Sequence, residues 1–373
     1  MSKNTPRSYF LDRLRVVLTA LVIFHHCAIT YGGSGGWFYR EFPENPNVSS
    51  SITLTMLCSI NQAFFMGMFF LIAGYFTPAA FERKGAKRYL AERFIRLGLP
   101  LLVFGLLLGP MTDAMADISK GNDFWSGWLW RLEHFTFVAG PLWFAWALLL
   151  FALAYAAWRA LGGKHANAVQ PVPGHAHWLA AALLVGAGAM LIRQWVPTGR
   201  NVWALQLGYF SSYIMLFALG CAAARHRWLE RIERQHALPW FFITLLAIPA
   251  LPLVAALFGA FEGKSVNFNG GWSWPAAAYA FWEPLVAWGI IALLLWQFRL
   301  RFNRPSPSWQ RWSEAAYAAF ILHAPVLVAV SLALRSWQAA PGLKFLVVGS
   351  LAVAASFWLG RQLRALPGMT RVL

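Results

Sequence analysis

LRVVLTALVIFHHCAITYG, residues 14–32, is the stretch that decides the fold, because it stays mostly apolar over the length that crosses a lipid bilayer. A membrane-spanning α-helix requires roughly 20 consecutive, mostly apolar residues. Further apolar runs follow it along the chain at 52–76, 97–112, 141–161, 178–195, 203–224, 239–261, 272–298, 312–335 and 344–361. The sequence therefore predicts an all-α fold, a polytopic transmembrane bundle of about ten helices.

The composition also favours a membrane protein. The chain of 373 residues is 59% hydrophobic and 12% charged, and it contains 21 Trp and 30 Phe. Soluble domains are roughly one quarter charged, whereas aromatic side chains are favoured at membrane–water interfaces. The net charge of +17 does not indicate a nucleic-acid partner, because the 31 Lys and Arg lie in short stretches between the apolar runs. We expect membrane lipids as neighbours and no nucleic acid.

The cysteines and the chain organisation narrow the class further. Cys27, Cys58 and Cys221 each lie in an apolar run, and their spacing suits neither a disulfide framework nor a metal site. The first run lacks a small-residue cleavage site followed by a soluble domain, so we expect a permanent helix there. The segment 113–140, rich in Trp and acidic residues, is expected to be interfacial or re-entrant. Residues 1–373 are predicted to form a single integral membrane domain.

The basic residues predict an orientation. If the N-terminus is cytoplasmic, 23 of the 31 Lys and Arg fall in segments that face the cytoplasm. The positive-inside rule predicts this bias. Both termini are therefore expected in the cytoplasm. In a bacterium, the protein would lie in the inner membrane with its other face toward the periplasm.

Few ionisable side chains lie deep in the predicted spans. They are His25, His26, Glu283, Glu314 and His323. An ionisable group at that depth costs several kcal/mol unless it is paired or hydrated. Each of these residues is therefore a candidate functional residue.

Arg15 and His26 form the first candidate pair. They are eleven residues apart, which places them on one helix face about 16 Å apart along the axis. Such a face could line a channel with a cation at its cytoplasmic mouth and a base at depth. Equally, Arg15 could anchor the helix at the interface and His26 could be a hydrogen-bonded residue of the bundle. His25 points about 100° away from His26 and is expected to be a supporting residue.

The other deep residues also have two explanations. His323 lies far enough into its span to meet His26 at a similar depth, or it is a hydrogen-bonded histidine of the bundle. Glu283 precedes Pro284, a predicted kink, and is a candidate relay or a structural partner. Glu314 lies near the cytoplasmic end of its span, where a salt bridge to a loop arginine explains it as well as a functional role does.

A basic pair precedes the third span. Arg93 and Arg96 are three residues apart and would share one face of an α-helix. Arginines in that arrangement can bind phosphates through charge-assisted hydrogen bonds. Attraction to anionic lipid headgroups is the alternative.

In these residues the chain resembles the acyltransferase family 3 membrane proteins. The first span of that family carries an arginine, ten residues and a histidine after an Asp-x-Leu-Arg sequence. The matching elements over residues 8–335 are Asp12 to Arg15 with His26, Phe69-Phe70-Leu71-Ile72-Ala73-Gly74, Arg93 with Arg96, Leu142-Trp143-Phe144, and Tyr317 with His323. Ala73 replaces a serine of the family, and Phe320 replaces a tyrosine often found there, which removes one hydrogen-bond donor. The segment 25–32 is similar to the branch that contains the glucan biosynthesis protein C enzymes.

The resemblance implies a function and a role for each residue. Family members move an acyl group from a cytoplasmic acyl-CoA, such as acetyl-CoA or succinyl-CoA, to a hydroxyl of an extracytoplasmic glycan. His26 would be the general base, for which an imidazole pKa of about 6.5 is suitable, and an acyl-histidine intermediate stays open. His323 and Tyr317 would polarise the thioester carbonyl or orient His26. Arg93, Arg96 and Arg15 would hold the phosphates, with His25, Glu283 and Glu314 in supporting positions.

Several alternatives stay open at this stage. A proton-coupled transporter or glycan flippase would also use intramembrane His and Glu, and a non-catalytic scaffold is a third class. Acyl-CoA is expected as a co-substrate, with no permanently bound cofactor and no metal. The acceptor glycan and the oligomeric state are left undetermined. Aromatic residues in the outward segments 33–51 and 113–140 suit either sugar stacking or interfacial anchoring.

Overall fold

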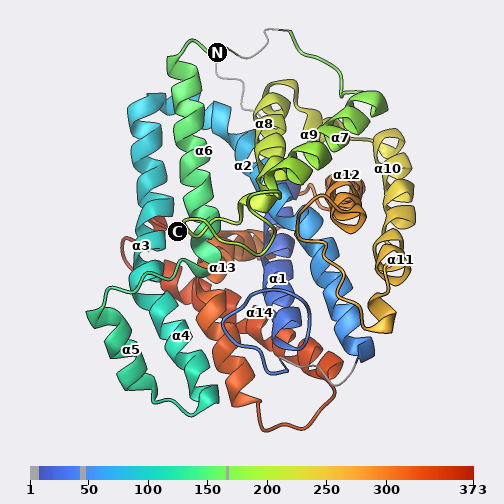
Figure 1. Cartoon of the computed structure of the whole chain (residues 1–373). Helices are drawn as coiled ribbons and strands as arrows, with labels where there is room; N and C mark the ends of the chain where they lie inside the picture. Colours follow the sequence, from blue (N-terminus) through green and yellow to red (C-terminus); the bar gives the residue numbers. More distant parts are fainter. Residues whose placement is uncertain (1–7, 43–47, 165–167) are drawn as a thin grey trace. The chain divides into compact units, whose positions relative to one another are not determined.

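The computed structural model describes residues 8–42, 48–164 and 168–373, and within these ranges the chain forms helices and loops without a β-strand. Figure 1 labels most of the α-helices along the chain. They are α1 (Tyr9–Thr30), α2 (Val48–Arg93), α3 (Leu99–Val103), α4 (Gly109–Asp117), α5 (Phe124–Glu133), α6 (Trp143–Ala160), α7 (His175–Ile192), α8 (Phe210–His226), α9 (Trp228–Arg231), α10 (Arg234–Ala247), α11 (Ala250–Leu257), α12 (Trp274–Arg301), α13 (Pro307–Ala333) and α14 (Pro341–Ala365). Two π-helical turns, Phe94–Gly98 and Phe104–Leu108, flank α3.

The helices account for all ten predicted spans. Over the described residues, nine helical segments are long and apolar enough to cross a membrane. One of them, Ser49–Lys120, contains two of the predicted spans, 52–76 and 97–112. The backbone leaves helical geometry between them at Gly85, whose φ of 72° and ψ of 163° suit a residue without a Cβ. The predicted all-α transmembrane fold is confirmed, and the protein is an integral membrane protein.

The described helices group into two compact units, each built from separate stretches of chain. The first unit draws on Met1–Arg15, Gln62–Glu82 and Lys164–Gln310. The second unit draws on Val16–Asn61, Arg83–Gly163 and Arg311–Leu373. That the chain functions as a single domain stays a prediction.

Small residues set the helix packing of the first unit. A Cβ on Gly74 of α2 would lie 2.2 Å from the carbonyl oxygen of Phe217 in α8, and one on Gly220 of α8 would lie 2.2 Å from the carbonyl oxygen of Leu71. Helices in a lipid environment associate closely where such small residues let the backbones approach. Gly74 and Gly220 therefore fix the crossing of α2 and α8.

The second unit has a continuous apolar core. Ile23 and Cys27 of α1 pack there with Cys58 of α2, Leu327 of α13 and Val348 of α14, all of them buried. α13 and α14 also approach closely at Gly360, where a Cβ would lie 2.8 Å from the backbone nitrogen of Ala319. This core fixes the part of α1 that carries His25 and His26 against α13 and α14.

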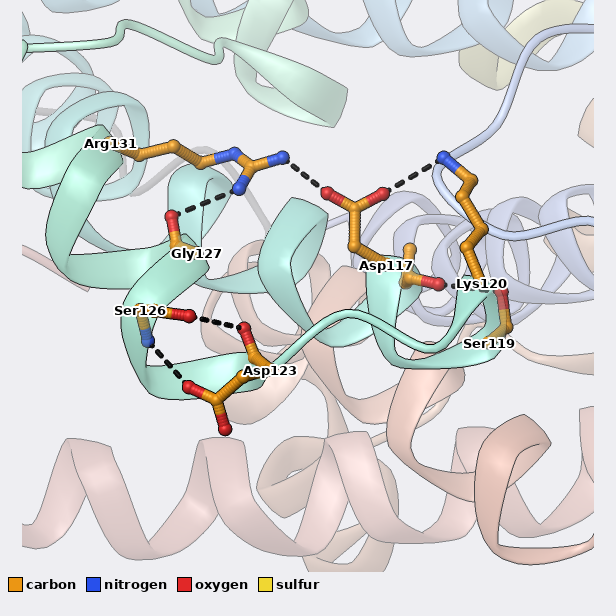
Figure 2. Close-up of polar contacts among 8 residues, drawn as sticks. Asp117, Ser119, Lys120, Asp123, Ser126, Gly127 and Arg131 are labelled. Atoms are coloured by element: carbon orange, nitrogen blue, oxygen red, sulfur yellow. Dashed lines mark hydrogen bonds and ion pairs between the residues drawn. The ribbon is translucent and has the colours of Figure 1, made fainter.

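Figure 2 shows the polar contacts that join α4 to α5 in the segment predicted to be interfacial or re-entrant. Arg131 donates to the Asp117 carboxylate at 2.5 Å and to the carbonyl of Gly127 at 2.9 Å, and Lys120 donates to the other Asp117 oxygen at 2.8 Å. Asp123 caps α5 by accepting from the Ser126 backbone N–H at 2.8 Å, and this hydrogen bond lowers the pKa of the carboxyl group.

The α4–α5 segment is helical rather than a plain loop. Trp125, Leu129 and Trp130 of α5 are exposed, whereas the polar contacts face α4. A short helix with an exposed aromatic surface suits the membrane interface. This arrangement agrees with an interfacial position for α5.

Gly74 gives a direct test of the helix crossing. Gly74→Ala places a methyl group against the Phe217 carbonyl, so we expect the free energy of unfolding to fall by about 1–3 kcal/mol. The matched control is Gly342→Ala in α14, where a Cβ meets no atom within 4 Å. Thermal unfolding of both purified variants in detergent checks the prediction. Equal unfolding temperatures for the two variants would contradict it.

Candidate active site

His26 of α1 and His323 of α13 lie together in the second unit, with Trp37 of the following loop against them. The ring centroids of His26 and His323 are 5.4 Å apart, with an interplanar angle of 18°. The Trp37 indole stacks on His26 at 3.7 Å and lies 5.8 Å from His323, nearly parallel to both imidazoles. We call these three residues the imidazole–indole cluster.

The three centroid distances define how the cluster is arranged. They form a triangle whose angle at His26 is close to a right angle. Trp37 therefore covers one face of the His26 ring, whereas His323 lies beside that ring. His323 is fully buried and His26 is half-buried. The two histidines that the sequence placed at a similar depth are thus neighbours in space.

The backbone fixes the tautomer of His323. Its Nδ1 lies 2.5 Å from the carbonyl oxygen of Phe320, one helical turn earlier. Because a carbonyl oxygen only accepts, Nδ1 carries the proton, and a neutral His323 keeps its lone pair on Nε2. The Phe320 ring packs between His323, at 5.6 Å, and Phe144 of α6, at 6.0 Å. Phe320, which replaces a tyrosine of the family, therefore supports His323 through apolar contact.

A buried ion pair holds the loop that carries Trp37. Lys344 of α14 donates to Glu41, with both side chains less than one-tenth exposed. Lys344 also donates to the carbonyls of Leu334 and Arg335, at 3.4 and 3.2 Å. The Glu41 backbone N–H donates to Thr30 at 2.9 Å. The loop is therefore fastened both to the end of α1 and to the start of α14.

Two residues that follow Trp37 in the loop also contact the rest of the unit: Tyr39 is buried and Phe38 packs against Gly140. Burial, together with the nearby charge of Glu41, raises the pKa of Tyr39 to about 12. Phe38 lies against Gly140, where a Cβ would approach the Phe38 ring to 2.9 Å. Gly140 has a φ of 46°, so this position favours glycine on conformational as well as steric grounds.

The basic pair lies at a π-helical turn of the second unit. Arg93 is the last residue of α2, with its guanidinium 5.2 Å from the Tyr89 ring centroid. Arg96 lies within the π-turn Phe94–Gly98 and its side chain is exposed. A π-turn is wider than an α-turn, so the two side chains diverge more than the α-helix predicted from the sequence would allow.

Tyr317 contacts this turn through its hydroxyl. The hydroxyl donates to the Arg96 carbonyl oxygen at 2.7 Å. π-turns leave the regular α-helical ladder and are frequent at functional sites. Tyr317 thus holds the backbone of the basic pair in place, and a direct contact with substrate stays a prediction.

Arg15 lies in the first unit, on the same uninterrupted helix as His26. Its guanidinium pairs with the Asp12 carboxylate one turn earlier and lies 5.8 Å from the Phe76 ring centroid. The side chain remains 43% exposed. It is therefore a partly exposed cation near the start of α1, and its catalytic role stays a prediction.

Glu283 has a structural partner that explains its burial. Arg193 pairs with Glu283 in the first unit, with less than one-tenth of either side chain exposed. Arg193 also donates to the Gly208 carbonyl at 3.0 Å, and its guanidinium lies 5.3 and 5.1 Å from the ring centroids of Tyr209 and Tyr279. From the sequence, Glu283 was either a proton relay or a structural partner. This ion pair favours the structural role.

The remaining supporting candidates are placed in the second unit. Glu314 pairs at 3.0 Å with Arg364, which lies in the last turn of α14 rather than in a loop. His25 is buried, and its ring meets His26 edge to face at 5.3 Å. The structure thus shows one neighbouring side chain for each residue, and their supporting roles stay predictions.

Over the described residues, no group of three or more His, Cys, Asp or Glu could hold a metal ion. Cys27, Cys58 and Cys221 are buried free thiols. The described site presents imidazoles, an indole, guanidinium groups and a tyrosine.

Comparison with known proteins gives the context for this geometry. Residues 8–361 match the acyltransferase domain of acyltransferase family 3. The chain belongs to this family. It is thereby grouped with enzymes that transfer acyl groups other than aminoacyl groups.

The curated relatives match over a smaller region. Glucans biosynthesis protein C from Salmonella paratyphi B, Salmonella heidelberg and Salmonella schwarzengrund is in each case 31% identical to this chain over 125 residues. That region is 33% of this chain and 31% of each relative, so the chain spans less than one third of their length. No solved structure matches the chain.

The family segments in α2 have structural roles of their own. Gly74 lies at the crossing with α8. Tyr75 donates its hydroxyl to Glu230 at 2.6 Å, and Ser8 at the start of α1 donates to the same carboxylate at 2.9 Å. These contacts fasten the beginning of α1 within the first unit.

The sequence did not identify Arg193, Glu41 or Lys344 as site or core residues, and it offered Trp37 only as an outward aromatic for sugar stacking or interfacial anchoring. Arg193 and Lys344 lie at the ends of predicted spans, where the positive-inside pattern treats a cation as a loop residue. Near the end of a predicted span, the hydropathy of the sequence does not show whether a cation is buried or exposed. A further sequence indication for Trp37 is its place shortly after His26, behind the glycine-rich segment 32–36.

The Arg193–Glu283 pair can be tested by double substitution. Arg193→Met and Glu283→Gln each leave one buried charge without its counter-charge, so each should cost about 3–5 kcal/mol of stability. The double variant Arg193→Met/Glu283→Gln should lose less than the sum of the single variants, because it leaves no buried charge. Thermal unfolding in detergent measures all three.

The exposed pair Lys264–Glu262, at 2.7 Å, provides the control. Glu262→Gln should leave the unfolding temperature nearly unchanged, since exposed ion pairs contribute about 0–1 kcal/mol. If the double variant loses as much stability as the two single variants together, the charges of Arg193 and Glu283 do not stabilise each other.

Proposed function

We propose that the protein is a membrane O-acyltransferase that moves an acyl group from an acyl-CoA to a hydroxyl of an extracytoplasmic glycan, with His26 as general base. The observation that supports this most directly is the imidazole pair of His26 and His323, 5.4 Å apart and within a membrane-spanning unit. Family membership supports acyl transfer as the reaction. The name of the relatives, glucans biosynthesis protein C, supports a glucan as one acceptor class.

The reaction needs a base for the acceptor hydroxyl and a proton donor for the leaving thiolate. An imidazole can serve both steps near neutral pH. His26 would take the hydroxyl proton as the acceptor oxygen attacks the thioester carbonyl, and it would later return that proton to the CoA sulfur. The lone pair on His323 Nε2 is suited to orient His26 and to stabilise its imidazolium form.

The donor end of the reaction is proposed to use the basic pair. Arg96 is exposed on a turn whose backbone is held by Tyr317, and Arg93 lies three residues earlier. Guanidinium groups bind phosphates through paired hydrogen bonds. Arg93 and Arg96 would therefore hold the phosphates of acetyl-CoA or succinyl-CoA. Arg15, on the helix that carries His26, is proposed as a further catalytic residue. We place the donor side in the cytoplasm of a bacterial inner membrane, in line with the distribution of basic residues.

His26 provides the first test of this proposal. The purified protein in detergent is supplied with acetyl-CoA or succinyl-CoA and a soluble linear glucan oligosaccharide. Release of free CoA and formation of a glycan ester are followed together. His26→Gln should lower kcat by about 10²–10⁴-fold, the contribution of a positioned general base.

His134→Gln is the matched control, because His134 is an exposed histidine next to α5. It should retain the activity of the unmodified protein. Full activity in His26→Gln would refute the assignment of the base. Transport of the oligosaccharide into proteoliposomes, without any ester formation, would instead support a transporter.

Arg96 provides a separate test of the donor site. Arg96→Ala should raise the KM for acetyl-CoA about tenfold or more and leave kcat nearly unchanged, because a lost charge-assisted contact costs about 1.5–3 kcal/mol of binding. Lys87→Ala, an exposed cation nearby in the sequence, is the control. An unchanged KM in Arg96→Ala would leave lipid headgroups as the partner of this arginine.

A further inference from the structure

Three buried ring nitrogens of the imidazole–indole cluster have no hydrogen-bond partner among the described residues. They are His26 Nδ1, His323 Nε2 and Trp37 Nε1. A buried polar group left without a partner costs about 1–3 kcal/mol. Three such atoms on mutually stacked rings point to a polar group that binds there.

The three nitrogens differ in what they can bind. An indole nitrogen always carries its proton and only donates. His323 Nε2 holds a lone pair, because Nδ1 donates to the Phe320 carbonyl. His26 must present a lone pair to act as a base. Trp37 Nε1 is therefore the one obligate donor of the cluster, and its partner must be an acceptor such as a carbonyl oxygen.

The two side chains to which the family resemblance assigns carbonyl polarisation already donate to backbone carbonyls. The sequence assigned carbonyl polarisation to His323 or Tyr317. His323 donates from Nδ1 to the backbone, and Tyr317 donates its hydroxyl to the Arg96 carbonyl. The indole N–H of Trp37 has no such partner in the described structure, and its ring is stacked on His26 at 3.7 Å.

We propose that Trp37 is a catalytic residue that donates its indole N–H to the carbonyl oxygen of the acyl group during transfer. The inference rests on the proposed function. The acceptor oxygen forms a bond to the carbonyl carbon while its proton passes to His26, and negative charge collects on the carbonyl oxygen opposite Trp37 Nε1. When the C–S bond breaks, the proton returns from His26 to the CoA sulfur. Trp37 keeps its proton throughout.

The loop that carries Trp37 is arranged for this role. The buried Glu41–Lys344 pair fastens its far end, and Phe38 is packed against Gly140 beside the indole. A donor held in place before the reaction stabilises developing charge without a cost of reorganisation at that moment. The pair therefore makes the indole a fixed part of the site.

Trp37→Phe tests the donor directly, because it keeps an aromatic ring for stacking and removes the N–H. With acetyl-CoA and the glucan oligosaccharide, kcat should fall by about 10²–10³-fold, the effect of losing one such donor. The KM for either substrate should change by less than about twofold, because the lost contact strengthens only in the transition state. Trp358→Phe, at an exposed Trp of α14, is the control and should keep full activity.

A second replacement tests the N–H of Trp37 independently of the shape of its bicyclic ring. Incorporation of a benzothiophene analogue at position 37 keeps the bicyclic ring and replaces the N–H by sulfur. It should lower kcat as Trp37→Phe does, while the thermal unfolding temperature stays that of the unmodified protein. Trp37→His, which restores a ring N–H, should recover part of the lost kcat.

The outcomes distinguish this inference from the proposed function. If the unmodified protein releases no CoA and forms no ester, the proposed function fails. If it is active and the benzothiophene variant keeps its kcat, the inference about Trp37 is overturned. A higher KM for the oligosaccharide with unchanged kcat would also overturn it, because it would show that Trp37 only stacks on the acceptor.

Discussion

In a lipid environment, a polar group finds its partner inside the protein or remains costly, and this constraint governs the arrangement of the chain. The backbone meets it through helices, which satisfy their own N–H and C=O groups. Buried charged side chains satisfy this constraint by forming ion pairs. Arg193 pairs with Glu283, and Lys344 pairs with Glu41. His26 and His323 have neither a carboxylate partner in the described structure nor full hydrogen bonding. The two histidines thus differ from the buried charges, and this difference is why we propose that a substrate group binds beside them.

Close helix packing complements these polar contacts. Gly74 and Gly220 bring α2 and α8 together within the first unit, and Gly360 does the same for α13 and α14 in the second. In the second unit, the packed core and the Phe144–Phe320–His323 contacts hold the histidines in place. Precise placement of a base thus depends on apolar contacts far more than on the few polar bonds around it.

Much of this could be predicted from the sequence. Hydropathy located the apolar stretches of the nine helical segments that could cross a membrane in the described residues. The contact of His26 with His323 was one of two open possibilities, because helical rise converts residue number into depth but does not show which helices pack together. The partners of the other residues could not be predicted. Arg193 and Lys344 lie at span ends, where sequence alone does not separate a buried cation from an interfacial one. The bond from Tyr317 to Arg96 depends on a π-turn, and the position of Trp37 depends on an ion pair between residues 41 and 344.

That ion pair has a consequence for how the protein is made. The loop with Trp37 follows the first helix, but its anchor Lys344 belongs to α14, and His323 belongs to α13. Synthesis proceeds from the N-terminus, so the early helices enter the membrane before either partner exists. The imidazole–indole cluster can form only once the C-terminal helices have been inserted. A nascent or prematurely ended chain would therefore carry His26 without His323 and without the ion pair that holds the Trp37 loop, so any activity that depends on this cluster would begin only when biosynthesis is complete.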